Sequence, residues 1–162
     1  MKKWSVLLVL VMLLSLVGCQ GKAADSVATA PPEADAAAQA LPDLPMVDIT
    51  EKMFIAQCND VYLNPDEYQG KAIRLEGMYQ NFEDSTDGTQ YHYVMRNSPG
   101  CCGADGTIGF EFLFDGEMPQ FNDWIEVVGT VEKVTLGESE YIVLRALKVT
   151  VLNERGAEFV SN

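Results

Sequence analysis

The chain has 162 residues, and its 24 acidic side chains outnumber the 11 basic ones, which gives a net charge of −13. A surface this acidic repels nucleic acid and anionic lipid headgroups, so we expect no nucleic-acid partner. The composition offers four cysteines and one histidine. No serine with a base, no His/Asp pair around a nucleophile and no phosphate-binding glycine loop stands out in the sequence, so we expect that the protein is not an enzyme.

The first 18 residues have the pattern of a bacterial lipoprotein signal peptide. Lys2 and Lys3 precede an apolar run that ends at Val17. At about fourteen residues this run is shorter than the roughly 20 that a spanning helix needs, and it has the length of a signal-peptide core. The run leads into Leu-Val-Gly-Cys, which ends at Cys19 and resembles the lipobox of bacterial lipoproteins.

This resemblance implies cleavage after Gly18 and acyl chains, including palmitate, on the thiol of Cys19. Two or three acyl chains would hold the protein stably on the cell membrane or outer membrane, outside the cytoplasm. An uncleaved anchor, or an ordinary secretory signal that happens to contain a cysteine, is the alternative.

Processing would change both the charge and the cysteine count. Loss of residues 1–18 removes two of the 11 basic residues and none of the 24 acidic ones, so the net charge moves from −13 to −15. Once Cys19 carries lipid, three cysteines remain, namely Cys58, Cys101 and Cys102. An odd number cannot all pair within the chain, so at least one is a thiol, a metal ligand or a bond to a partner.

Composition divides the rest of the chain into a tether, a domain and a tail. Residues 19–46 are rich in Ala, Pro and Asp and contain no aromatic side chain, so we predict a lipidated, disordered linker. We predict one barrel domain over residues 47–155 and a flexible tail over residues 156–162. About 110 residues are enough for one modest core.

The start of the domain has helical periodicity. Asp48 with Glu51 three residues later is an N-cap signal, and we predict a helix over residues 49–63. Its apolar side chains, Phe54, Cys58, Val61 and Tyr62, fall on one face. We therefore expect Cys58 to be a core residue.

After the predicted helix, inward-facing and outward-facing positions alternate along the chain, and this pattern predicts five strands. Phe110, Phe112 and Phe114 form the strongest apolar stripe, and they are expected to point into one core. Asp87-Gly88 and Gly137-Glu138 are expected to make hairpin turns. The predicted strands cover residues 73–79, 91–96, 108–114, 125–131 and 141–152.

Two of these strands share a pattern that bears on the fold. "IRLEGMY" (73–79) and "IEVVGTV" (125–131) each carry an interior glycine, which often marks a bend or bulge where a sheet curls. Such strands in first and fourth position favour a mainly β fold, a small five-stranded OB-like Greek-key barrel with one N-terminal helix. A two-layer sandwich is the alternative.

Three stretches carry a family resemblance: "NPDEYQGKAIRLEGMY", "CCGADGTIGFEF" and "DWIEVVGTV". Together they resemble a family of uncharacterised bacterial envelope lipoproteins with an OB-fold domain. More distantly, they are similar to the soluble domain of membrane proteins that accompany a predicted permease and carry a Cys-Cys pair followed by Ala-Asp. The resemblance implies an OB fold and a membrane-protein or permease partner, and it implies no activity.

The adjacent Cys101 and Cys102 lie in a glycine-rich loop and admit three interpretations. Neighbouring Cα atoms are about 3.8 Å apart, so a disulfide between them would be strained and would act as a redox switch. A soft ion such as Cu(I), or Zn completed by His92 and Asp105, is the second interpretation. Buried thiols that pack the loop against the barrel are the third. His92, the single histidine, is otherwise expected at the surface or at the barrel end.

The aromatic residues Tyr91, Tyr93 and Phe110 could form a stacking face, as in OB domains that bind nucleic acid, but the negative charge argues against that ligand. Taken together, the sequence predicts a membrane-anchored lipoprotein whose OB-like domain binds a protein partner or a ligand, without catalysis and without a cofactor. A thiol protein that acts through Cys101 and Cys102 is the alternative.

Overall fold

The computed structural model describes residues 42–101 and 103–161. The predicted signal peptide, the lipidation site Cys19 and most of the predicted linker lie outside the described residues. Within the described part, no helix is long and apolar enough to cross a membrane.

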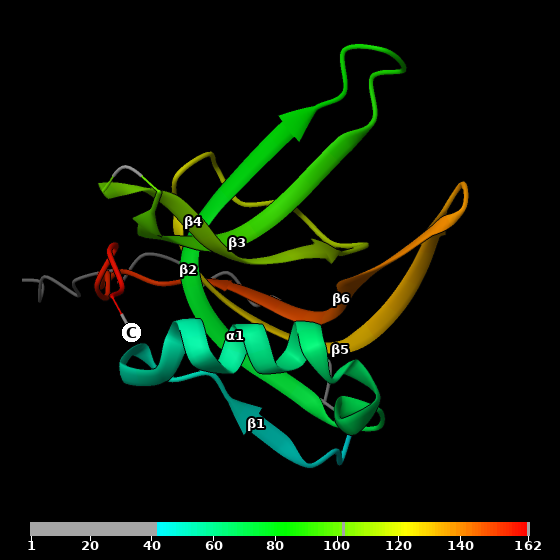
Figure 1. Cartoon of the computed structure of the whole chain (residues 1–162), viewed down its shortest axis with the longest axis horizontal. Coiled ribbons are helices and arrows are strands. Elements are labelled where there is room, and N and C mark those ends of the chain that lie inside the picture. Colours follow the sequence, from blue (N-terminus) through cyan, green and yellow to red (C-terminus); the bar gives the residue numbers. More distant parts are fainter. Residues whose placement is uncertain (1–41, 102, 162) are drawn as a thin grey trace, which may run out of the picture. The chain divides into compact units, whose positions relative to one another are not determined.

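The described residues form a closed β-barrel with one α-helix beside it (Figure 1). Strands run in the order β2-β3-β4-β6-β5, and β5 pairs again with β2 to close the barrel. The β4–β6 pair is parallel, and the other four barrel pairs are antiparallel. The elements are β1 (Met46–Asp48), α1 (Phe54–Leu63), β2 (Ala72–Glu83), β3 (Gln90–Gly100), β4 (Gly103–Leu113), β5 (Trp124–Leu136) and β6 (Ser139–Val151).

This architecture confirms the predicted mainly β fold, a five-stranded barrel with one N-terminal helix. The five predicted strands are all present, and most extend beyond the predicted bounds at one or both ends. Gly88 and Gly137 lie in the two predicted hairpin turns with φ values of 76° and 63°, a conformation that glycine adopts readily.

The barrel closes because β2 changes partners halfway along its length. Its first half pairs with β5 as far as Met78, and from Met78 onward it pairs with β3. Gly77 lies at the change. A Cβ atom there would be 2.8 Å from the carbonyl oxygen of Met95, so the close approach of β2 and β3 requires glycine.

The second interior glycine lies at a bulge. The register between β5 and β6 shifts between Val128 and Gly129, and a Cβ on Gly129 would be 2.8 Å from the Arg145 carbonyl oxygen. A bulge bends and twists its strand. The interior glycines of the two similar strands therefore lie where the sheet curls, as predicted.

Inward-facing side chains of all five barrel strands meet the apolar face of α1 in one core. Phe110 and Phe112 are fully buried, as predicted, whereas Phe114 follows the end of β4 and is only partly buried. Cys58 is also fully buried, as predicted. The largest fully buried side chains are Trp124, Phe54, Phe110, Phe112, Ile73, Leu75, Ile125, Leu144, Val61, Val94, Val127 and Val143.

The predicted start of the helix is wrong. The α-helix begins at Phe54 after a short 3₁₀ turn, and Asp48 does not cap it, because its carboxylate pairs with Arg74 at 2.7 Å. The amide oxygen of Gln57 instead accepts a hydrogen bond from the Thr50 N–H at 2.8 Å. Asp48 belongs to β1, and a side chain that reaches across to β2 is no longer available to the helix.

The short strand β1 was not predicted. It pairs in parallel with residues 72–74 of β2, whose other edge pairs with β5. From Met78 onward, β3 takes the edge that β1 occupies here. Three residues are too few to show a period of two, so the sequence carries no signal for this strand.

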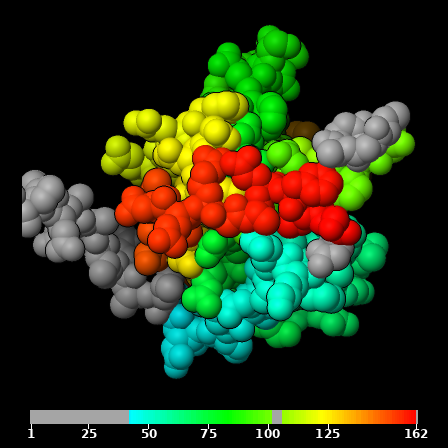
Figure 2. Space-filling model, turned by 90° about the vertical axis from the view of Figure 1, so that its left-hand side faces the viewer, coloured from blue at the N-terminus to red at the C-terminus, as the bar shows by residue number. Residues whose placement is uncertain are grey.

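The predicted flexible tail is also wrong for residues 156–161, because they are bound to the barrel. Asn97 on β3 donates its N–H to the Glu158 carbonyl and accepts one from Val160, whose side chain is buried. Figure 2 shows this red segment crossing the molecule between the yellow segment that follows β4 and the blue-green helical region. The backbone donors and acceptors of β3 hold the segment there, which composition could not reveal.

Candidate functional site

Side chains on the outer face of the barrel, together with Tyr62 of α1, form the candidate site. On β3 and β4 the even-numbered residues Val94, Phe110 and Phe112 are buried in the core, so the odd-numbered residues between them face outward. Tyr93 on β3 is directly opposite Glu111 on β4. We call the following five residues the tyrosine–Glu111 cluster: Tyr62, Tyr91, Tyr93, Glu111 and Tyr141.

Tyr93 lies at the centre of the cluster. Its hydroxyl donates a long hydrogen bond, 3.5 Å, to the Glu111 carboxylate. On its other side, the ring of Phe82 meets the Tyr93 ring edge to face, with 5.6 Å between ring centroids. Phe82 is 53% exposed, so the aromatic surface continues from β3 to β2.

Tyr62 reaches the cluster from α1 through a seam in the barrel. β4 and β6 pair only at Phe112 and Leu113, so the Gly109 carbonyl lies outside the ladder that joins these two strands. The Tyr62 hydroxyl donates to that carbonyl at 2.6 Å, and its ring stacks on Phe110 at 4.9 Å. The helix therefore satisfies a backbone acceptor that the strands leave unpaired.

Tyr141 and Tyr91 interact electrostatically with other members of the cluster. Burial, together with the charge of Glu111, raises the pKa of Tyr93 and of Tyr141, and Tyr91 raises both further. Burial chiefly raises the pKa of Tyr62, and Tyr93 and Glu111 add to this. These shifts favour the neutral hydroxyl form of Tyr62, Tyr93 and Tyr141.

Glu111 is the one charged member of the cluster. Burial raises the pKa of its carboxyl group, and the Tyr93 hydroxyl offsets this only in part. Among residues 42–101 and 103–161, Glu111 has no ion-pair partner. The cluster therefore presents a partly buried carboxylate that no cation of the described chain compensates.

The structure places the three aromatic residues considered for a stacking face on two different sides of the sheet. Tyr91 and Tyr93 lie on the outer face, but Phe110 points the other way and is fully buried. The sequence did not single out Glu111, Tyr62 or Tyr141. Alternation along β4 and β6 could have placed Glu111 and Tyr141 outside, but no local pattern brings a residue of α1 to them.

The cysteine loop lies elsewhere on the molecule. Gly100 pairs with Gly103 at the end of the β3–β4 hairpin, and Cys101 is exposed in the turn between them. Cys102 and the side chain of Asp105 lie outside the described residues. In the part of the chain that the structure describes, no group of three or more His, Cys, Asp and Glu side chains could hold a metal ion.

The structure does not bring His92 to this loop. Cys101 is nine positions after His92, which is about 30 Å along an extended strand. His92 is half-buried at the other end of β3, where its Nδ1 lies 2.8 Å from the Tyr79 hydroxyl and its ring stacks with Tyr79. A zinc site that combines His92 with Cys101 therefore does not fit this fold.

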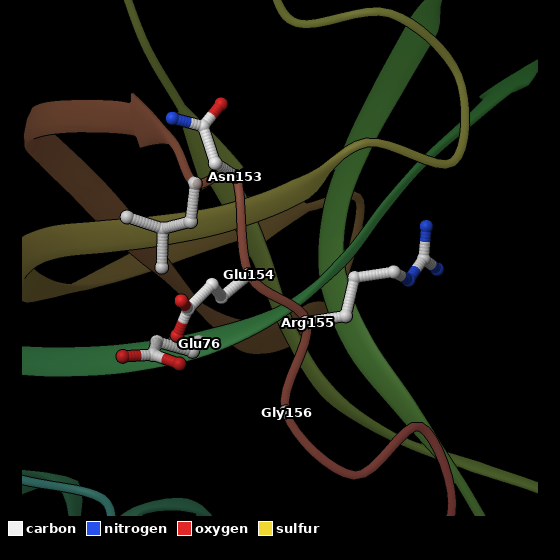
Figure 3. A pocket seen from close by; sticks show the side chains of 6 residues that line it. Glu76, Asn153, Glu154, Arg155 and Gly156 are labelled. Carbon is white, nitrogen blue, oxygen red and sulfur yellow. The ribbon is translucent and has the colours of Figure 1, made fainter.

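A pocket of about 570 Å³ lies where the segment after β6 passes β2 (Figure 3). Glu76 and Glu154 turn their carboxylates toward the same side, whereas Arg155 points away. Arg155 is held by the Asn122 carbonyl at 3.0 Å and by Glu158 at 2.8 Å. The pocket thus holds two acidic groups, and Leu152 is the one apolar side chain among its lining residues, which makes it a weaker candidate than the tyrosine–Glu111 cluster.

Comparison with known proteins adds a family but no activity. A family model described as the DUF1980 C-terminal domain, an uncharacterised family, matches residues 28–159. No curated protein and no solved structure matches the chain.

Proposed function

The chain belongs to the DUF1980 C-terminal domain family, and we propose that it is a lipid-anchored envelope protein whose barrel binds a protein partner or a ligand. It acts by binding, without catalysis and without a cofactor. The observation that carries this proposal is the outer face of β3 and β4, where the Tyr93 hydroxyl meets the Glu111 carboxylate and Phe82 packs against the Tyr93 ring.

The position of the cluster supports a binding role. OB-like barrels bind their ligands on the face of the second and third strands, beside the loops that join the first strand to the second and the fourth to the fifth. Here those strands are β3 and β4, which carry Tyr91, Tyr93 and Glu111. Partly exposed tyrosines suit such a face, since each offers a large apolar ring and a polar end at low cost in conformational entropy.

The lipid anchor would determine at which membrane the protein meets its partner. Acyl chains on Cys19 would hold the barrel at the cell membrane or outer membrane, outside the cytoplasm, and a net charge of −15 after processing would keep it off the anionic lipid surface. A membrane protein, such as a permease, is the partner that this placement favours. Cys19→Ser should release the protein from the membrane fraction or leave it unprocessed. Membrane fractionation and the mass of the mature N-terminus are the measurements, and no change in either would contradict the anchor.

In-cell photo-crosslinking tests the binding face. A photoreactive amino acid at position 91, on the outer face of β3, should capture a discrete partner in intact cells. The matched control carries the same amino acid at position 154, an exposed position beside the pocket. Capture from position 154 but not from position 91 would move the site to the pocket, and capture from neither would contradict a protein-binding role.

One observation favours a second candidate function, a thiol protein. Cys101 is exposed between two glycines of the chain, and the next residue is Cys102. Such a pair could bind Cu(I) or Zn, or switch between dithiol and disulfide. Metal analysis of the reduced full chain should then find about one ion per chain, or peptide mapping should find a reversible loss of two hydrogens from the Cys101–Cys102 peptide.

Cys58 is the internal control for this test. Burial raises its pKa to about 12 and its side chain is inaccessible, so it should not react with a thiol reagent in the folded protein. If Cys101 labels in the folded state but binds no metal and undergoes no reversible oxidation, exposure alone explains the reactivity and the second candidate fails.

A further inference from the structure

Taking the proposed binding face as its basis, we propose that the tyrosine–Glu111 cluster recognises a basic side chain, the guanidinium or ammonium group of an Arg or Lys on a protein partner. Two features carry this assignment: an uncompensated carboxylate and the aromatic side chains on the same face, with Tyr93 directly beside it. A third, the charge of the whole chain, acts at longer range.

The first feature is the unpaired charge of Glu111. A partly buried carboxylate without a counter-ion costs free energy, because it has lost part of its hydration and gained little in return. Its hydrogen bond from Tyr93 is long, 3.5 Å, and burial raises the pKa of the group. A cationic side chain from a partner would restore the missing interaction.

The neighbouring cation on this face is already engaged. Arg145 on β6 pairs across the seam with Leu113, two residues beyond Glu111 on β4. Its guanidinium, however, holds both carboxylate oxygens of Glu132, at 2.9 and 3.2 Å. Glu111 therefore remains available to a cation from another molecule.

The second feature is the set of rings. Tyrosine faces attract cations through the ring quadrupole, and a cation that also meets a carboxylate gains from both. Tyr93 is within hydrogen-bonding distance of Glu111, and Tyr62 and Tyr141 are within its electrostatic range. These three tyrosines belong to β3, α1 and β6.

The form and charge of the surface favour a protein-borne cation. The cluster lies on the outside of a sheet, and the pocket of about 570 Å³ lies elsewhere, between β2 and the segment after β6. An open face suits a side chain presented by a partner better than it suits a small molecule that must be enclosed. A net charge of −13 also speeds the approach of a basic partner and disfavours an acidic one.

The test uses the full chain in detergent, labelled with 3-fluorotyrosine and observed by fluorine NMR. The probe is the peptide acetyl-Gly-Arg-Gly-amide, and its neutral isostere carries citrulline in place of arginine. The arginine peptide should shift the signals of the four cluster tyrosines and leave those of Tyr68 and Tyr79 in place. The citrulline peptide should bind about tenfold more weakly, since it lacks the charge that the rings and Glu111 attract.

Two variants locate the site. Glu111→Gln should weaken binding of the arginine peptide about tenfold and, because it removes an unpaired buried charge, should raise the midpoint of unfolding. Glu154→Gln, which makes the same charge change beside the pocket, should leave peptide binding unchanged. If Glu111→Gln perturbs the fold instead, Tyr141→Leu provides the second measurement, with the same expected loss.

Equal binding of the arginine and citrulline peptides, or unchanged binding by both Glu111→Gln and Tyr141→Leu, would overturn the assignment. Binding of choline with no binding of the arginine peptide would point to a free organic cation and would also overturn it. The binding face and the cation assignment can fail independently of each other. If crosslinking from position 91 captures a partner that the arginine peptide does not displace, the binding face stands and only the cation assignment falls.

Discussion

At the scale of single residues, Arg96 shows how the barrel accommodates a buried charge. The residue is 3% exposed, and its guanidinium lies between the rings of Phe54 and Trp124, 4.7 and 4.8 Å from their centroids. Its donors reach the Glu76 carbonyl at 2.8 Å, and the Ala157 carbonyl and the Glu51 carboxylate at 3.0 Å each. A buried cation is tolerated here because its donors are used and aromatic faces cover it.

His92 carries a testable pH dependence at the same scale. Burial lowers its pKa below the unfolded value of about 6.5. As the pH falls through 6.5, the unfolded chain takes up a proton that the folded chain resists, so His92 should reduce stability on acidification. His92→Gln removes this titration and keeps a side chain that can hydrogen-bond Tyr79.

The measurement is the urea midpoint of both proteins at pH 7.5 and at pH 5.5. Wild type should lose more stability than His92→Gln over this interval, since all other titrations are common to both proteins. Parallel curves would mean that the imidazole is as easily protonated in the folded barrel as in the unfolded chain.

At the scale of elements, the β3–β4 pair depends on one glycine. A Cβ on Gly109 would lie 2.0 Å from the Val94 carbonyl oxygen and 2.6 Å from the Met95 Cα. The two strands can therefore approach only while position 109 has no side chain. The carbonyl of the same residue accepts the hydrogen bond from Tyr62. Gly109 therefore contributes both to the pairing of β3 with β4 and to the contact of α1 with the barrel.

Gly109→Ala should accordingly destabilise the fold by at least about 2 kcal/mol, since β3 and β4 must separate to admit a methyl group. Thr107→Ala, at an exposed position on the same strand, should change stability by no more than about 0.5 kcal/mol. Thermal unfolding of the three proteins gives the comparison. A Gly109→Ala melting temperature equal to that of wild type would show that the strands can shift without loss.

At the scale of the whole molecule, the segment after β6 acts as a strap across the barrel. It pairs with Asn97, buries Val160 and places the backbone of Ala157 between Arg96 and Glu51. Arg155 on the same segment covers the Trp124 ring at 5.6 Å. The strap thus links β3, β5 and the residues just before α1, which are distant in the sequence.

Removal of residues 154–162 should therefore cost about 3 kcal/mol and lower the melting temperature by about 10 °C, through lost burial and unpaired backbone and Arg96 donors. Removal of residues 161 and 162 alone is the matched control and should leave the melting temperature unchanged. Equal melting of the two truncated proteins would show that the strap adds nothing to the stability of the barrel.

The sequence by itself determined the local features of this protein. Alternation placed Phe110 and Phe112 in a core, a helical period placed Phe54 and Cys58 on the buried face of α1, and two interior glycines marked where the sheet curls. These predictions succeeded because each depends on neighbours within a few residues along the chain.

Only the tertiary structure decided which of these elements meet. The short strand β1, the strap on Asn97 and the partial seam between β4 and β6 depend on which strand edges are left to pair, and no local pattern records that. The same holds for the candidate site. Tyr62, Glu111 and Tyr141 are far apart in the sequence and converge through barrel closure and helix docking, whereas His92 and Cys101 stay apart because one extended strand separates them.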